Sequence, residues 1–172
     1  MTAKILWFTG LSGSGKTTIS NEVKNYLEYE QNKVLILDGD DVRKRFHSHL
    51  GFTPEDILEN NRLICEICLN EKEKYDFIIV PIISPFRESR VKARSLLGSN
   101  FIEVFLSCSI EECRKRDVKG LYKQALAGEI ENFIGISKNT PYESPDNPEI
   151  ILNTETETVQ ESLKKILSFL GF

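Results

Sequence analysis

Eight residues near the amino terminus have the types and the spacing needed to hold a polyphosphate: Gly10-Leu-Ser-Gly-Ser-Gly-Lys-Thr17, here called the phosphate loop. Glycines let the main chain approach an anion closely, so several backbone N–H groups can point at it. Lys16 can reach the β- and γ-phosphates of a nucleotide, and the Thr17 hydroxyl can ligate Mg²⁺. The motif predicts binding of Mg-ATP by Gly10, Leu11, Ser12, Gly13, Ser14, Gly15, Lys16, Thr17 and Thr18.

A pair of carboxylates follows the next apolar run, in Asp38-Gly39-Asp40. Open α/β sheets bind ligands where their strands end. Two carboxylates at such an edge can ligate a metal through water or accept a proton from an acceptor hydroxyl. The alternative is that one of them caps the helix that follows.

Three arginines follow strand ends at the same predicted edge. Arg43 comes shortly after the second apolar run, and Arg87 and Arg90 come shortly after the third. Guanidinium groups bind phosphate and carboxylate through paired N–H donors. The group indicates an anionic acceptor beside ATP, although a solvated helix face is the alternative for any single arginine.

Strand and helix signals alternate along the chain and place these residues. Apolar runs predict strands at 4–9, 34–37, 77–83, 101–106 and 150–152, and helical spacing predicts helices at 16–30, 55–72, 87–97, from Ser109 onward, and at 157–170. Such alternation implies parallel pairing through right-handed crossovers. We therefore expect an α/β phosphate-loop nucleoside-triphosphate-hydrolase fold, a five-stranded parallel sheet with helices on both faces, as one domain over residues 1–172.

Residues 117–148 form the exception to this alternation. The stretch is polar, carries three glycines and three prolines, and lacks sustained periodicity. A loop of this length in a compact domain is usually a functional lid or disordered. We expect a lid, because Leu121-Tyr122 and Phe133-Ile134 give it apolar anchors.

Composition narrows the partners. The 172 residues carry a formal net charge of −4 with no basic stretch, which argues against a nucleic-acid partner. No apolar run is long enough for a bilayer and no signal peptide precedes the first strand, so we expect no membrane partner and a cytoplasmic location. Cys65 and Cys68 have helical spacing with no second pair and no nearby histidine, so a core helix is favoured over a metal or redox site.

Several motifs together resemble the adenylylsulfate kinase family over nearly the whole chain. They are Gly10 to Thr18, Asp38-Gly-Asp40, Leu50-Gly-Phe52, Glu59-Asn60, Ile83-Ser-Pro-Phe-Arg87, Arg116-Asp117, Lys119-Gly-Leu-Tyr-Lys123, Asn132-Phe133 and Pro141-Tyr-Glu143. The phosphate loop alone is widespread. The Lys119 to Lys123 motif combined with Ser84 to Arg87 is specific.

The resemblance implies transfer of the γ-phosphate of Mg-ATP to the 3′-hydroxyl of adenylylsulfate by a homodimer. Lys16, Asp40 and Lys119 would be catalytic, and Arg116 would lie on the ATP side of the lid. Phe52 and Phe133 would sandwich the acceptor's base. The acceptor site would comprise Asp38, Asp40, Arg43, Phe52, Asn60, Ile83, Ser84, Arg87, Lys119, Gly120, Leu121 and Phe133.

Departures from the family pattern gather on the acceptor side. Ile57, Leu63 and Leu126 stand where the family usually has arginines, and His47 and His49 stand where it has Asn and Asp. Loss of a charge-assisted contact to an anion costs on the order of a few kcal/mol. Either His47, His49 or Arg62 compensates, or the acceptor is another nucleotide. A related branch phosphorylates cytidine diphosphoramidate, which stacking on two Phe rings would tolerate.

Two further classes of function remain open: a nucleotide-dependent switch without an acceptor, and a regulatory remnant of a kinase. The paired phenylalanines and the arginines beyond the ATP site argue against the switch. Intact Lys16, Thr17 and Asp40 argue against the remnant.

Overall fold

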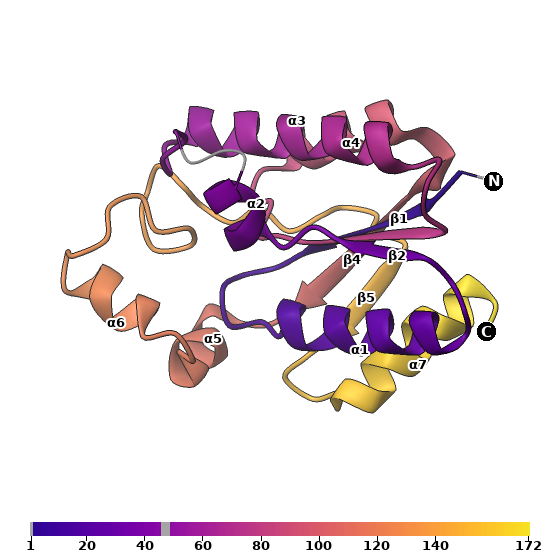
Figure 1. The fold of residues 1–172 in the computed structure, drawn as a ribbon. Coiled ribbons are helices and arrows are strands. Elements are labelled where there is room, and N and C mark those ends of the chain that lie inside the picture. Colours follow the sequence, from indigo (N-terminus) through magenta and orange to yellow (C-terminus); the bar gives the residue numbers. More distant parts are fainter. Residues whose placement is uncertain (1, 46–48) are drawn as a thin grey trace.

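Five parallel strands form the centre of the molecule, in the order β2-β3-β1-β4-β5. The computed structural model describes residues 2–45 and 49–172. Helices cover both faces of the sheet (Figure 1). This confirms the predicted α/β phosphate-loop fold.

The predicted elements agree with the observed ones to within three residues at each end. The strands are β1 (Lys4–Thr9), β2 (Val34–Ile36), β3 (Phe77–Pro81), β4 (Phe101–Ser107) and β5 (Ile150–Asn153). The predicted helices are α1 (Lys16–Tyr29), α3 (Pro54–Glu71), α4 (Arg87–Leu97), α5 (Ile110–Arg116) and α7 (Val159–Leu170).

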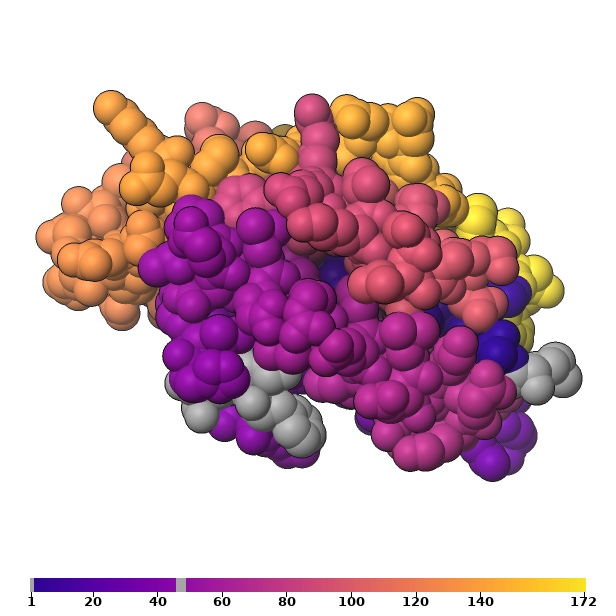
Figure 2. All heavy atoms as spheres, turned by 90° about the horizontal axis from the view of Figure 1, so that it is seen from above, coloured from indigo at the N-terminus to yellow at the C-terminus, as the bar shows by residue number. Residues whose placement is uncertain are grey.

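Two apolar layers, one on each face, hold the sheet. α1 and α7 pack on one face against Leu6, Phe8 and Ile79, whereas α3 and α4 pack on the other against Ile5 and Ile78. The alternation arises because successive side chains of a strand point to opposite faces. With both faces covered, the strands must be apolar on both sides, as Ile5 to Phe8 of β1 and Phe77 to Pro81 of β3 are. Figure 2, seen from the side of α3 and α4, shows that the violet-to-pink surface covers most of this face and that indigo amino-terminal atoms are visible only in patches.

Helix α1 carries the predicted apolar stripe of Ile19, Val23 and Leu27, all buried. Full burial of such a side chain contributes about 1.5–3 kcal/mol. The stripe presses the first turn of α1, and with it the end of the phosphate loop, against the sheet.

Cys65 and Cys68 lie buried on the sheet-facing side of α3, which confirms the prediction of a core helix. Burial raises the pKa of the Cys65 thiol to about 12. His47, by contrast, lies outside the described residues. No helix within residues 2–45 and 49–172 is long and apolar enough to span a membrane.

The sequence assigned no bounds to three short elements: α2 (Gly39–Arg45), which had entered only as the helix that an aspartate could cap, the 3₁₀ turn η1 (Gly98–Asn100) and α6 (Leu121–Leu126). Each has at most seven residues, too few for an apolar period to be recognised. Helix α6 depends on a local cap, since the Asp117 carboxylate accepts hydrogen bonds from the N–H groups of Tyr122 at 3.0 Å and Lys123 at 3.1 Å.

Candidate active site

The phosphate loop leaves β1 in the middle of the sheet and leads directly into α1 (Figure 1). Its first residue must be glycine for steric reasons. A Cβ on Gly10 would lie 2.8 Å from the Ser14 hydroxyl oxygen and 3.0 Å from the Leu106 carbonyl oxygen. The loop is thus compressed between its own turn and the end of β4. Gly15 caps α1 without a side-chain hydrogen bond, so the first N–H groups of the helix stay available to an anion.

Lys16 is folded back over this loop. Its Nζ donates to the carbonyl oxygens of Gly10 at 2.8 Å and Leu11 at 2.7 Å. Burial lowers the pKa of Lys16 to about 8, because the charged ammonium has lost its hydration. The two carbonyl dipoles compensate the positive charge only in part, and a phosphate bound here would supply a full negative charge.

Thr17 and Thr18 are exposed on the first turn of α1. Among the described residues, the Thr17 hydroxyl has no hydrogen-bond partner, and only its main-chain carbonyl is engaged, by Ser20. Mg²⁺ prefers oxygen ligands and keeps several waters. An unpaired hydroxyl with Asp38 and Asp40 across the site fits such an ion.

Asp38 lies directly before α2, and Asp40 lies in its first turn, where it meets Lys119. Lys119 Nζ donates to Asp40 Oδ2 at 2.7 Å, and this hydrogen bond raises the pKa of Lys119. Asp38 Oδ1 accepts from the Asp40 N–H at 3.0 Å, so Asp38 does cap the helix, which was the alternative for one member of the pair. The charges of Asp38, Asp40 and Lys119 all act on Lys16. Residues from three separate segments therefore share one electrostatic site.

Arg43 covers the aromatic ring predicted to hold the acceptor's base. Its guanidinium carbon lies 4.5 Å from the centroid of the Phe52 ring. The same group donates to the carbonyl oxygens of Leu50 at 3.1 Å and Gly51 at 2.5 Å. Phe52 is 52% exposed. A base that stacked on this face of Phe52 would have to displace a cation.

Phe133 packs against Tyr122, within its own segment 117–148, and not against Phe52. Its ring meets the Tyr122 ring edge-on, with centroids 5.0 Å apart, in an apolar cluster that includes Leu11 of the phosphate loop. The described residues show no ring contact between Phe52 and Phe133. Gly120 and Leu121 lead into α6 beside this cluster.

Ser84 lies buried shortly after the end of β3, beside the half-buried Ile83, and Asn60 is buried on α3. The Ser84 hydroxyl lies 3.3 Å from Asn61 Nδ2 and 3.4 Å from the Ser89 hydroxyl, inside the protein. Ser84 adopts a left-handed backbone conformation with φ of 44°, unusual for a residue with a side chain. The carbonyl oxygen of Ser84 lies 3.3 Å from the hydroxyl of Thr9, at the end of β1.

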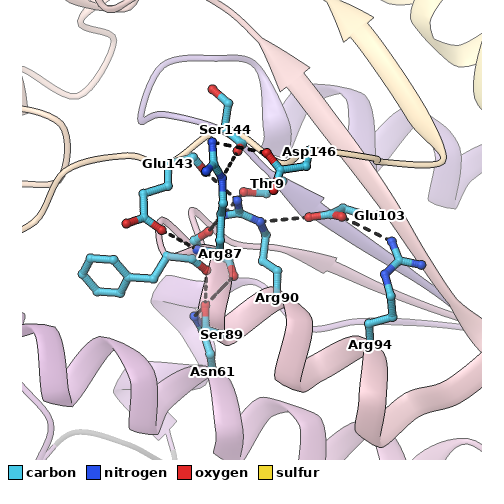
Figure 3. Close-up of polar contacts among 12 residues, drawn as sticks. Thr9, Asn61, Arg87, Ser89, Arg90, Arg94, Glu103, Glu143, Ser144 and Asp146 are labelled. Carbon is cyan, nitrogen blue, oxygen red and sulfur yellow. Dashed lines mark hydrogen bonds and ion pairs between the residues drawn. The ribbon is translucent and has the colours of Figure 1, made fainter.

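Arg87 and Arg90, which follow β3, make their contacts with other residues of the protein (Figure 3). Arg87 Nε donates to the Ser144 carbonyl oxygen at 2.7 Å, and its backbone N–H donates to Glu143. Arg90 is 3% exposed and pairs with the buried Glu103 at 2.9 Å. The expectation that Arg90 could join an anion-binding group was wrong, because Glu103 on β4 holds it in the interior.

Arg116 lies at the end of α5, on the β4–β5 side of the phosphate loop. It donates to Glu112 Oε1 at 3.0 Å and to the Thr154 carbonyl oxygen at 2.6 Å. A cavity of about 610 Å³ also borders Leu11, lined by the ends of β4 and β5 and by residues of the segment 135–144.

Two tyrosines that the sequence did not assign also contact the site. Tyr122 Oη donates to the Ser12 carbonyl oxygen at 2.9 Å, and Tyr142 Oη lies 2.9 Å from Thr9 Oγ1. Both tyrosines belong to motifs that carry the family resemblance, and that resemblance could have indicated that they lie near the site.

A lysine-bearing phosphate loop between β1 and α1, with an acidic pair at the neighbouring strand end, defines a phosphate-loop kinase. The family model for adenylylsulphate kinase matches residues 2–153. The adenylyl-sulfate kinase of Clostridium kluyveri is 48% identical over 97% of this chain and 83% of the relative, and that of Staphylococcus epidermidis is 47% identical over 96% and 83%. The chain belongs to the adenylylsulphate kinase family.

A solved structure agrees in shape. The Mycobacterium tuberculosis APS kinase CysC, in complex with AMPPNP and APS, superposes with a TM-score of 0.92 at 35% identity and covers 99% of both chains. The whole fold is therefore shared, including the segment 117–148.

We expect Lys16→Ala to lower phosphoryl transfer by at least about 100-fold, since it removes the cation that meets the transferring group. The melting temperature should change little, because removal of a buried, desolvated charge offsets the loss of its hydrogen bonds to Gly10 and Leu11. Lys24→Ala, on the partly exposed side of the same helix, is the matched control. A steady-state rate for Lys16→Ala within a few-fold of wild type would exclude this role.

Proposed function

We propose that this protein transfers the γ-phosphate of ATP to the 3′-hydroxyl of adenylylsulfate. The observation that carries the proposal is the convergence of Lys16, Asp40 and Lys119 from three segments at one edge of the sheet. Relatives named for this activity, at 47–48% identity, support the choice of acceptor.

In this proposal, ATP lies along the phosphate loop. The loop amides and the positive end of the α1 dipole hold the β- and γ-phosphates, and Lys16 turns from its two carbonyl partners toward them. Arg116 contributes on the nucleotide side. Mg²⁺, held by Thr17 and by waters on Asp38 and Asp40, would neutralise charge on the phosphates.

The acceptor then lies between Asp40 and Phe52. Asp40, which is paired with Lys119, orients the 3′-hydroxyl and accepts its proton as the new bond to phosphorus forms. Lys119 can then donate to the transferring phosphoryl group as negative charge gathers there. The acceptor's base replaces Arg43 on Phe52, which frees Arg43 to bind the acceptor's anionic group.

We further propose that residues 117–148 of this single domain act as a lid that closes over both substrates. Support comes from the Lys119–Asp40 ion pair and the Tyr122–Ser12 hydrogen bond, which join the segment to the site. Figure 2 shows the orange surface of this segment adjoining the violet surface around the start of α3. The homodimeric state and the cytoplasmic location rest on the family resemblance and the composition, and light scattering on purified protein tests the first.

Cytidine diphosphoramidate is the second candidate acceptor. Ile57, where the family usually has an arginine, is only 4% exposed and adds no charge to the acceptor side. The catalytic chemistry on the 3′-hydroxyl would be unchanged.

The deciding experiment measures ADP release by a coupled assay with adenylylsulfate and, separately, with cytidine diphosphoramidate. We expect turnover with adenylylsulfate at a kcat/KM well above that for the second nucleotide. Turnover of the second nucleotide alone would replace the proposed acceptor. ATP hydrolysis at the same rate with and without either acceptor would favour the nucleotide-dependent switch.

Asp40→Asn tests the proton acceptor. The amide keeps the size of the side chain but cannot take a proton, so kcat should fall by about 100-fold or more. The affinity for ATP should stay within about three-fold, because binding of the phosphates does not need this proton transfer. Equal losses in kcat and in ATP affinity would mean that Asp40 acts only through the water-held Mg²⁺ and not as the proton acceptor.

Phe52→Ala tests stacking of the acceptor. Loss of one stacked base contact costs about 1–3 kcal/mol, so KM for adenylylsulfate should rise at least about five-fold, with KM for ATP unchanged. Tyr29→Phe, on a side chain that is 79% exposed, serves as the control for an aromatic surface change. An unaltered acceptor KM would remove Phe52 from the site.

A further inference from the structure

Thr9 lies where the phosphate loop, the end of β3 and the lid meet. It is the last residue of β1, directly before Gly10, and it is fully buried. Its Oγ1 lies 2.7 Å from the Ile83 carbonyl oxygen, 3.3 Å from the Ser84 carbonyl oxygen and 2.9 Å from Tyr142 Oη. One hydroxyl therefore joins three segments of the chain.

The direction of these hydrogen bonds follows from proton counting. A threonine hydroxyl has one proton to donate, and the 2.7 Å contact to the Ile83 carbonyl is the shortest of the three. The Ser84 carbonyl oxygen can only accept, and at 3.3 Å it shares the same Thr9 proton weakly. The contact with Tyr142 must then be donated by Tyr142, whose pKa is raised to about 12 by burial so that it stays protonated. The bonds run from Tyr142 to Thr9 to Ile83, which we call the Thr9 relay.

Arg90 fixes the same segments from the other side (Figure 3). It donates to the Ser84 carbonyl oxygen at 2.5 Å and also to the Glu143 carbonyl oxygen. Its ion pair with Glu103 prevents it from turning away. The strand end at Ser84 and the chain segment 141–143 are thus fastened to each other and, through Thr9, to the root of the phosphate loop.

We infer that Thr9 is a positioning residue that couples the ATP site to the acceptor site through this relay. The phosphate loop begins directly after Thr9. Ile83, which is predicted to line the acceptor site, accepts the last hydrogen bond of the relay. A shift of the Ile83 carbonyl therefore displaces groups at the ATP site, at the acceptor site and at the end of the lid. The acceptor half of this inference rests on the proposed function, and the ATP half does not.

Thr9→Val is the test variant, since it keeps the shape and removes both the donor and the acceptor. Tyr142→Phe removes one donor only. We expect Thr9→Val to weaken binding of a non-hydrolysable ATP analogue about five-fold or more in titration calorimetry, and to lower kcat with adenylylsulfate. The change in acceptor affinity caused by the bound analogue should shrink. Tyr29→Phe, on the exposed surface, should leave each of these quantities unchanged.

The double variant separates a relay from two independent structural contacts. If both hydroxyls act in one chain of bonds, Thr9→Val with Tyr142→Phe should be hardly worse than Thr9→Val alone. Additive losses, or a lowered melting temperature with unchanged analogue affinity and kcat, would overturn the inference. Should wild type fail to use adenylylsulfate, the proposed function falls, whereas the analogue affinities still decide the relay.

Discussion

Parallel pairing of β1 with both β3 and β4 is the constraint on which the site depends. In register, Thr9 at the end of β1 lies opposite Phe105, and Phe8 lies opposite Pro81. Parallel strands end at the same edge, so the phosphate loop, Ser84 and the start of α5 must gather there. The apolar layers on both faces prevent the strands from slipping, because a one-residue shift would turn every buried side chain over. Distances between reacting groups are thereby set by the core.

Two buried cations, Lys16 and Arg90, lie close to this edge, and their charges are compensated in different ways. Lys16 donates to two main-chain carbonyl oxygens and, at 3.5 Å, to the Ser14 hydroxyl oxygen, and it keeps a lowered pKa. Arg90 has a full partner in Glu103, which Arg94 also contacts at 3.3 Å. A buried ion pair adds little net stability, yet loss of one member is costly. The lysine is therefore ready to exchange its partners for a phosphate, whereas the arginine is fixed as part of the framework.

Much of the fold could be predicted from the sequence, because its signals are long and local. The strands are continuous apolar runs, the stripe on α1 has helical spacing, and Gly10 to Thr17 is a contiguous motif. What the sequence did not reveal depends on contacts between distant residues. Nothing near Arg90 in the sequence shows that Glu103 will bury it, and Phe133 meets Tyr122 only because α6 forms. Thr9 reads as one more strand residue until Tyr142 is folded against it.

Because Lys16 is buried, binding of ATP is coupled to the uptake of a proton. With a pKa of about 8, the side chain is only partly charged in the free protein at mildly alkaline pH. Polyphosphate beside it favours the ammonium form and raises that pKa, so the protein must draw a fraction of a proton from the buffer as ATP arrives. Below pH 8 the proton is already present. Above it, the uptake opposes binding, and affinity for ATP declines as the solution becomes more basic.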